Sequence, residues 1–263
     1  MLDLRVRQPQ GGVADNPCGS MNRNLLKEYP AASALAIGLV AFPLAKLLFI
    51  PNYVFNFLAT LVHECGHSLF AWLVGRPSIP SVSVAGGGVT VWSDQKWFLC
   101  MAVLAALVML TLRYRESRGI WIPLAAAVIL YPFLAFTRAR DVVPIAGGVA
   151  LECFGAAACF YTVFEVHLER PFERPLYALW GWWMILNRGA ETVLMMKSRA
   201  YWESQTVIDS GIAAGLTSDL EMIRQLLGSS PAPVLGVVLF LCVAALPGAA
   251  LAAWIHRRFA NPG

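Results

Sequence analysis

Residues 52–75 read NYVFNFLATLVHECGHSLFAWLVG, a long apolar run interrupted near its middle by the string His63-Glu64-Cys65-Gly66-His67. On a helix, His63 and His67 stand at positions i and i+4, so both imidazoles leave the same face one turn apart. Two neutral imidazole nitrogens at that spacing can bind one Zn²⁺. Glu64 is suited to take a proton from a water on that metal, first as general base and then as general acid. This H-E-x-x-H pattern therefore predicts a catalytic metal site.

The apolar setting of the motif strengthens this prediction. Chance matches to such a short pattern fall mostly on exposed polar helices, where His and Glu cost nothing to keep. Within hydrocarbon, two His and a Glu cost several kcal/mol unless they pair or bind something. The chain contains only 4 His, and two of them stand in this run.

The composition is that of a membrane protein with several spans. The chain has 263 residues, of which 58% are hydrophobic and 14% are charged, whereas a soluble domain carries about 25% charged residues. The net charge of +4 is scattered along the chain, which gives no support to nucleic-acid binding. The 6 cysteines form no C-x-x-C pair, so we expect no disulfide framework.

The order of apolar and polar stretches predicts an all-α polytopic fold. We expect a flexible polar tail over residues 1–30 and a single membrane domain over 31–258, with an interfacial polar segment at 165–230. Pro51-Asn52 is expected to turn the chain sharply, so that the first two helices become antiparallel neighbours. The short run 176–187 adds a seventh span only if it crosses. The six expected spans are 31–50, 52–75, 97–112, 119–137, 142–164 and 233–255.

This six-span arrangement has one internal conflict. It puts the basic N-terminal tail and the basic C-terminal end, His256-Arg257-Arg258, together in the cytoplasm. The arginine-rich loop at 113–118 then falls on the opposite side of the membrane, against the usual preference of such loops for the cytoplasm.

Residues 76–95, RPSIPSVSVAGGGVTVWSDQ, differ from the apolar runs around them. Two short alternating stretches flank Gly86-Gly87-Gly88, which is typical of a β-hairpin. The alternative is a plain surface loop. If a hairpin lies beside the metal site, its exposed edge offers a place where an unwound substrate adds as a further strand.

The string LVHECGHSLFAWLVGRPSIPSVSVAGGGVTVW, residues 61–92, resembles site-2 proteases, the intramembrane zinc metalloproteases, and in particular their bacterial members. It matches their H-E-x-G-H motif, followed by a helix end at Gly75 and a glycine-rich hairpin. The resemblance implies that His63 and His67 bind zinc and that Glu64 is the catalytic acid and base. It also implies hydrolysis of peptide bonds in transmembrane substrates, at the bacterial inner membrane.

The third zinc ligand is left open, because catalytic zinc takes three protein ligands and one open position. In the family this ligand is usually an Asp followed by Gly in a later membrane helix, and no matching string occurs here. The candidates are Glu152, Asp141, Asp209 and Asp219. Glu152 ranks first because it lies mid-span on a face of small residues. The alternative for Glu152 is a structural acid paired with a neighbouring Arg or hydroxyl.

Two other functions compete with proteolysis. A non-proteolytic membrane protein could keep the zinc site in order to sense metal, transport an ion or hold a membrane partner. A structural membrane protein with a coincidental motif would bind no metal. The presence of Glu64 favours an enzyme, because a purely structural zinc site has no need of a general base.

Overall fold

The computed structural model describes residues 30–84, 87–165, 172–206 and 219–260. Almost all of the expected N-terminal tail therefore lies outside the described residues, as do Asp209 and Gly86. The described chain is mainly helical, with one two-stranded antiparallel sheet. In order, the elements are α2 (Pro30–Leu47), α3 (Phe49–Leu73), β1 (Ser78–Val82), β2 (Gly88–Trp92), α4 (Trp97–Arg113), α5 (Arg118–Phe136), α6 (Ala139–Phe164), α7 (Glu173–Lys197), α8 (Arg199–Thr206), α9 (Asp219–Leu227) and α10 (Pro231–Ala260).

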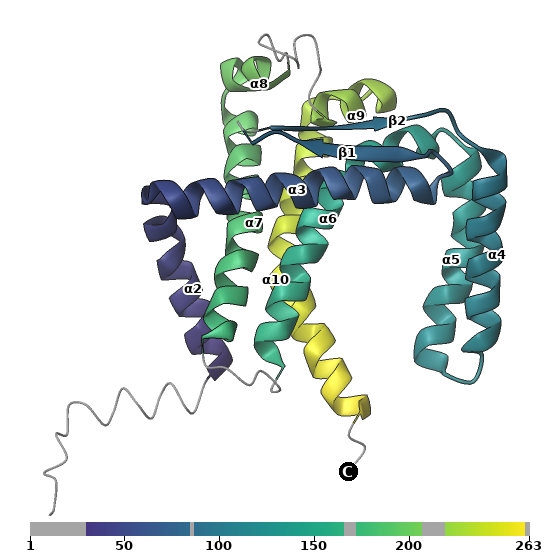
Figure 1. Cartoon of the computed structure of the whole chain (residues 1–263), viewed down its shortest axis with the longest axis horizontal. Coiled ribbons are helices and arrows are strands. Elements are labelled where there is room, and N and C mark those ends of the chain that lie inside the picture. Colours follow the sequence, from purple (N-terminus) through teal and green to yellow (C-terminus); the bar gives the residue numbers. More distant parts are fainter. Residues whose placement is uncertain (1–29, 85–86, 166–171, 207–218, 261–263) are drawn as a thin grey trace, which may run out of the picture.

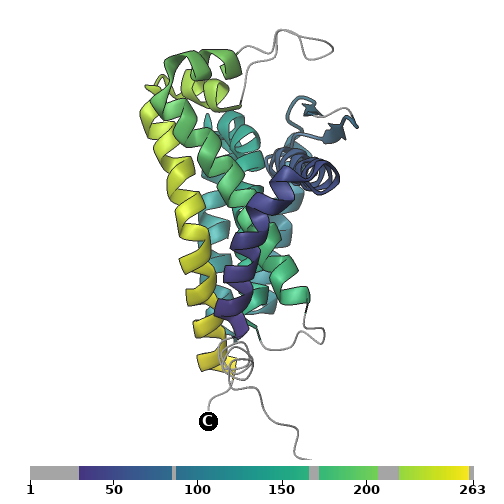
Figure 2. The same ribbon diagram turned by 90° about the vertical axis from the view of Figure 1, so that its left-hand side faces the viewer.

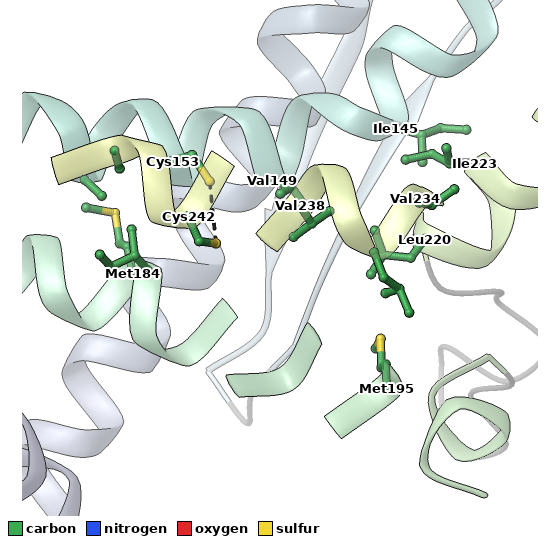
Figure 3. Close-up of a cluster of buried hydrophobic side chains, with 14 of the residues drawn as sticks. Ile145, Val149, Cys153, Met184, Met195, Leu220, Ile223, Val234, Val238 and Cys242 are labelled. Carbon is green, nitrogen blue, oxygen red and sulfur yellow. Dashed lines mark hydrogen bonds between the residues drawn. The ribbon is translucent and has the colours of Figure 1, made fainter. Parts of the chain in front are cut away.

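Helices α2, α6, α7 and α10 pack lengthwise into a bundle (Figures 1 and 2). The largest buried cluster joins α6, α7, α9 and α10. Figure 3 shows Val149 and Cys153 of α6 facing Val238 and Cys242 of α10, with the two thiol sulfurs 4.0 Å apart. On the other side of α7, Trp182 donates from Nε1 to the Leu35 carbonyl of α2 at 3.0 Å.

The motif helix α3 lies across this bundle instead of alongside its helices (Figure 1). The expectation that 31–50 and 52–75 form antiparallel neighbours is therefore wrong. Leu48 is the one residue between the two helices, and its extended backbone (φ −90°, ψ 126°) changes the chain's direction. Pro51 does not make a turn but stands in the first turn of α3, where the missing N–H of proline leaves no helical bond unmade.

Four of the described helices are long and apolar enough to cross a membrane: α2, α5, α6 and α10. Helix α4 is apolar but shorter. The described residues therefore support a membrane protein, whereas six spans are not confirmed. The run 176–187 turns out to be part of α7, a helix of 25 residues. In its polar continuation, Arg188 pairs with Glu191 of the same helix and with Glu152 of α6.

With α3 lying across the bundle, the arginine-rich loop lies at a different end of the molecule from the one that six spans predicted. Because α3 lies across the bundle, the turn between α4 and α5 lies at the same end of the molecule as the start of α2 and the end of α10 (Figure 1). Arg113 ends α4 and Arg118 begins α5, so these arginines flank the turn and share an end with Arg257 and Arg258.

The predicted hairpin and the predicted helix end are both confirmed. Gly75, with φ +78°, ends α3. The Arg76 N–H bonds the Ala71 carbonyl at 2.8 Å and the Gly75 N–H bonds the Trp72 carbonyl at 3.0 Å, which is a Schellman C-cap. The chain then reverses into β1, which pairs with β2 in the register Ser78↔Trp92 to Val82↔Gly88.

Candidate metal centre

Three potential ligand atoms converge where α3 meets the start of α9. The Nε2 atoms of His63 and His67 lie 3.0 Å apart. Asp219 Oδ2 lies 2.9 Å from the first and 3.0 Å from the second. Among the described residues, this trio is the group of His, Cys, Asp and Glu side chains whose ligand atoms lie close enough together to hold one metal ion.

A contact of Nδ1, the ring nitrogen that does not face Asp219, fixes the orientation of the His67 ring. Its Nδ1 lies 2.8 Å from the carbonyl oxygen of Pro144 in α6. A carbonyl oxygen can only accept a hydrogen bond, so Nδ1 of a neutral His67 bears the hydrogen. The Nε2 lone pair of His67 therefore points toward Asp219.

The His63 ring is held in the same way by a buried ion pair. Its Nδ1 lies 3.1 Å from Glu152 Oε1 and 3.2 Å from Arg188 Nη2. The carboxylate oxygen can only accept, so in the tautomer that donates to Glu152 the hydrogen is on Nδ1. Arg188 of α7 holds this carboxylate through two bonds, Nε to Oε2 at 2.8 Å and Nη2 to Oε1 at 3.0 Å. A metal-binding His usually donates its second N–H to such a carboxylate, which fixes its tautomer and raises its basicity. In the tautomer that donates to Glu152, His63 also presents an Nε2 lone pair.

Three electron-pair donors that face one another are stable only with a cation between them. Zinc bonds of about 2.0–2.2 Å place tetrahedral ligand atoms roughly 3.3 Å apart. The observed separations of 2.9–3.0 Å are only a few tenths shorter, so the three groups fit an ion of this size. In the metal-free protein, a proton on an Nε2 must take the place of the cation.

Asp219 is suited to be the anionic member of this set. Burial alone would raise the pKa of its carboxyl group, but when no metal is bound, hydrogen bonds from His63 and His67 whose Nε2 carries a hydrogen outweigh that effect and hold the pKa below its ordinary value. The group is therefore ionised at neutral pH, as a metal ligand must be. Its side chain is 30% exposed, so the site opens to the surroundings on the Asp219 side.

Glu152, expected to be the third ligand, lies on the wrong side of His63 for that role. It contacts Nδ1 and Arg188, whereas the ligand atoms face Asp219 at Nε2. The structure thus fits the alternative considered for Glu152, a structural acid paired with an Arg. Asp141 is also engaged elsewhere, in an ion pair with Arg76.

Asp219 reaches the site because α9 folds back onto the bundle. Leu220 and Ile223, three residues apart on α9, are buried in the main cluster with residues of α6 and α10. That packing directs the first residue of α9 toward α3. The apolar spacing of Leu220 and Ile223 was visible in the sequence, but nothing in it indicated which surface would cover them.

Sequence reasoning missed Arg188 entirely. It follows the aromatic run of α7 and bonds both Glu152 and, through Nη1, Glu191 Oε2 at 2.8 Å. A basic residue three positions before an acid, next to an apolar run, was the available signal.

Glycines of α6 allow its backbone to approach the candidate metal ligands directly. A Cβ on Gly148 would lie 2.6 Å from His67 Nε2 and 2.7 Å from His63 Nε2. Next to it, Gly147 and Gly66 of the motif pack backbone to backbone where α3 crosses α6. The two helices cross through glycines, and no side chain separates α6 from the imidazoles.

Glu64, the predicted acid and base, is held by the hairpin. Its side chain is buried, and Thr90 Oγ1 of β2 donates to its Oε2 at 2.7 Å. A Cβ on Gly88 would lie 2.7 Å from Glu64 Oε1, so the glycine leaves room for the carboxylate. The hairpin therefore lies beside Glu64, the position that the sequence analysis considered as one possibility.

Comparisons with known proteins identify no relative: no protein-family model, curated protein or solved structure matches the chain. The function must therefore be argued from the geometry of the site.

Proposed function

We propose that the protein is an intramembrane zinc metalloprotease, which hydrolyses peptide bonds of membrane-embedded proteins with a metal-activated water. The observation that carries this proposal is the convergence of ligand atoms from His63, His67 and Asp219. Glu64, which follows His63 directly in the sequence, is buried. Three protein ligands leave a coordination position open for reaction, which is typical of catalytic zinc and not of structural zinc.

The residues divide the chemistry between them. Zinc bound by the trio would polarise the peptide carbonyl and lower the pKa of a water toward neutrality. Glu64 leaves α3 about 100° around the axis from His63 and about 60° from His67, so it stands beside the ligands without being one. It takes the proton of the attacking water and returns it to the leaving amine. Thr90 positions the Glu64 carboxylate through its hydroxyl.

The surroundings fit a substrate that arrives within the bilayer. Helices α2, α5, α6 and α10 have the length and composition of membrane spans. Gly148, where an added Cβ would lie within 2.7 Å of both imidazoles, stands about 14 Å along α6 from Ala139 at 1.5 Å per residue. The site therefore lies along a spanning helix, between its first residue and its centre. The proposal includes a bacterial inner-membrane location, on the resemblance of residues 61–92 to site-2 proteases.

The test compares the wild type with Glu64→Gln and His67→Ala in detergent, each with its zinc content measured. A proteome-derived peptide library serves as substrate, and new termini are counted by mass spectrometry. We expect about one zinc per chain in the wild type and in Glu64→Gln, and cleavage by the wild type alone. Cleavage by Glu64→Gln at the wild-type rate would refute the proposed role of Glu64. Bound zinc with no cleavage by the wild type would instead indicate a non-proteolytic zinc protein.

A further inference from the structure

One face of α3 is exposed and apolar over most of the length of the helix. Its exposed positions follow one another at helical intervals, so that they form a single stripe. The stripe consists of Val54, Leu58, Leu61, Leu69 and Trp72. In its one gap stands Cys65, which is half-buried. A continuous apolar stripe of this length requires an apolar partner.

The stripe lies on the opposite side of α3 from the candidate metal ligands. Val54 and Trp72 stand nine residues before and nine residues after His63, which puts both half a turn around the axis from it. His63 faces Asp219 of α9. Figure 1 shows α9 at the end of the molecule away from the turn between α4 and α5. The stripe therefore faces the other way, toward the part of the molecule that contains the spanning helices.

Helix α3 lies at one level of the molecule. It crosses the bundle in Figure 1 and is seen almost end-on in Figure 2. Helices α2, α4 and α5 run from this level to the opposite end (Figure 1). Their 18, 17 and 19 residues correspond to about 26–29 Å at 1.5 Å per residue. The hydrocarbon core of a bilayer is about 30 Å thick, so the level of α3 matches one edge of the hydrocarbon.

Side chains that favour the boundary between membrane and water occur at the same level. Lys46 stands in the last turn of α2, and Lys96 immediately precedes α4. Both are exposed, and Trp97 beside Lys96 is 72% exposed. Lysines near the ends of spans extend to the headgroups, and Trp is enriched at that depth. At its other end α4 finishes with Arg113, so the apolar length between Lys96 and Arg113 is about that of one hydrocarbon core.

The composition of α3 also differs from that of a span. With 25 residues the helix is long enough to cross a bilayer. Among the described helices, however, the four that combine that length with sufficient hydropathy are α2, α5, α6 and α10. A helix with an apolar stripe on one side and polar residues on the other typically lies in the plane of the interface, with its apolar face about 5–10 Å deep.

We infer that α3 lies flat at the surface of the bilayer and that its stripe contacts the lipid acyl chains of one leaflet. The face with His63 and His67 then points away from the hydrocarbon, where water is available to a metal. This inference does not depend on the proposed protease function. Combined with that function, it places the scissile bond near one end of the substrate's membrane span.

The experiment measures the depth of single nitroxide labels in the full chain, reconstituted in phosphatidylcholine vesicles. A keto amino acid is encoded at one position at a time and coupled to the nitroxide as an oxime, so the native cysteines stay in place. The label replaces Val54, Leu61 or Leu69. Collision rates are measured with oxygen, which dissolves in hydrocarbon, and with a neutral nickel chelate, which dissolves in water. The ratio of the two rates rises with depth.

Three positions of α5 provide the matched scale. Ile122, Ile129 and Phe136 are exposed and stand seven residues apart on one face. In a spanning helix they differ in depth by about 10 Å per step, so the ratio should be highest at Ile129 and lower at both ends. Circular dichroism checks the fold of each labelled chain, and Leu58 replaces any α3 position whose label lowers the helix content.

We expect the three α3 labels to give one common ratio, close to that of Phe136, because they lie at the same depth. If α3 crossed the membrane, Val54 and Leu69 would stand about 22 Å apart along the membrane normal, and ratios that change along α3 as they do along α5 would overturn the inference. Nickel collision rates equal to those of free nitroxide in water would overturn it as well, because water would then cover the stripe. Spin–spin broadening that disappears on dilution with unlabelled protein would instead identify a second copy as the partner and would also refute lipid contact.

Discussion

Replacing Glu152 with Gln, beside Asp219→Ala, tests which carboxylate binds the metal. Glu152 acts on the metal only through His63, from 3.1 Å behind its Nδ1. Loss of such a partner typically lowers metal affinity by about 10–100-fold, or about 1.4–2.7 kcal/mol. Gln keeps an oxygen that can accept the Nδ1 hydrogen, so we expect a value near about tenfold. Asp219→Ala removes one of the three ligand atoms together with its charge, and we expect a loss of more than about 100-fold.

The assay is competition for zinc against a chelator of known affinity, on detergent-purified protein whose fold is checked by circular dichroism. Glu191→Gln is the matched control. Glu191 also bonds Arg188, through Nη1 at 2.8 Å, but no bond joins it to His63 in the described structure. The control thus removes an equal charge from the same arginine, and its zinc affinity should stay at the wild-type value. The reverse order, with Glu152→Gln losing more affinity than Asp219→Ala, would refute the assignment of Asp219 as ligand.

Three further predictions address the setting of the site. Gly148→Ala would place a methyl group 2.6–2.7 Å from both imidazole Nε2 atoms, so it should lower zinc affinity by at least about tenfold. Gly155→Ala on the same helix is the control, because its Cβ would lie 3.4 Å from the nearest atom, and it should leave zinc affinity unchanged. Equal losses of zinc affinity in the two variants would contradict the close approach at Gly148. Removal of zinc by a chelator should lower the thermal midpoint of unfolding of the wild type, because zinc at 100 times its Kd contributes about 2.7 kcal/mol to the free energy of unfolding. The midpoint of Asp219→Ala should change little. A midpoint that is insensitive to the chelator in both proteins would argue against a metal bound to the native state. Tyr53→Phe removes the bond to Val84 and should speed amide exchange in the hairpin by about two- to tenfold, measured by hydrogen–deuterium exchange, while zinc affinity stays constant.

Local signals in the sequence were enough for the parts of the site that lie close together in the chain. The i, i+4 spacing places His63 and His67 on one face because helix geometry alone determines it. The hairpin and the helix end at Gly75 follow from residues whose backbone preferences are strong. Each of these features depends on contacts within about twenty residues, and the structure contains them as expected.

The third ligand depended on contacts that no local pattern contains. Depth in the membrane favoured Glu152, because a mid-span carboxylate must find a partner. It did find one, Arg188 of α7, while the third member of the candidate trio comes from a short helix far along the chain. The choice between the two acids was decided by how α9 packs through Leu220 and Ile223.

The count of six spans is not confirmed, for a related reason. An apolar run of sufficient length was taken to cross the membrane, yet α3 lies across the bundle with its apolar positions exposed. Hydropathy measures the preference of a segment for an apolar environment. It does not indicate whether the segment runs along the bundle or across it. Pro51 was expected to make a turn, although proline is equally at home in the first turn of a helix.

The separation of the ligands along the chain has a consequence for biosynthesis. His63 and Asp219 are 156 positions apart, so the ribosome must add all the residues between them before the ligand set can be complete. At about 5–20 residues per second, that interval lasts roughly 8–30 s. During this time a nascent chain has its general base and two imidazoles but lacks the anionic ligand. On the proposed assignment, the growing chain therefore gains hydrolytic activity only when its last quarter is made, and neighbouring membrane proteins are safe from it until then.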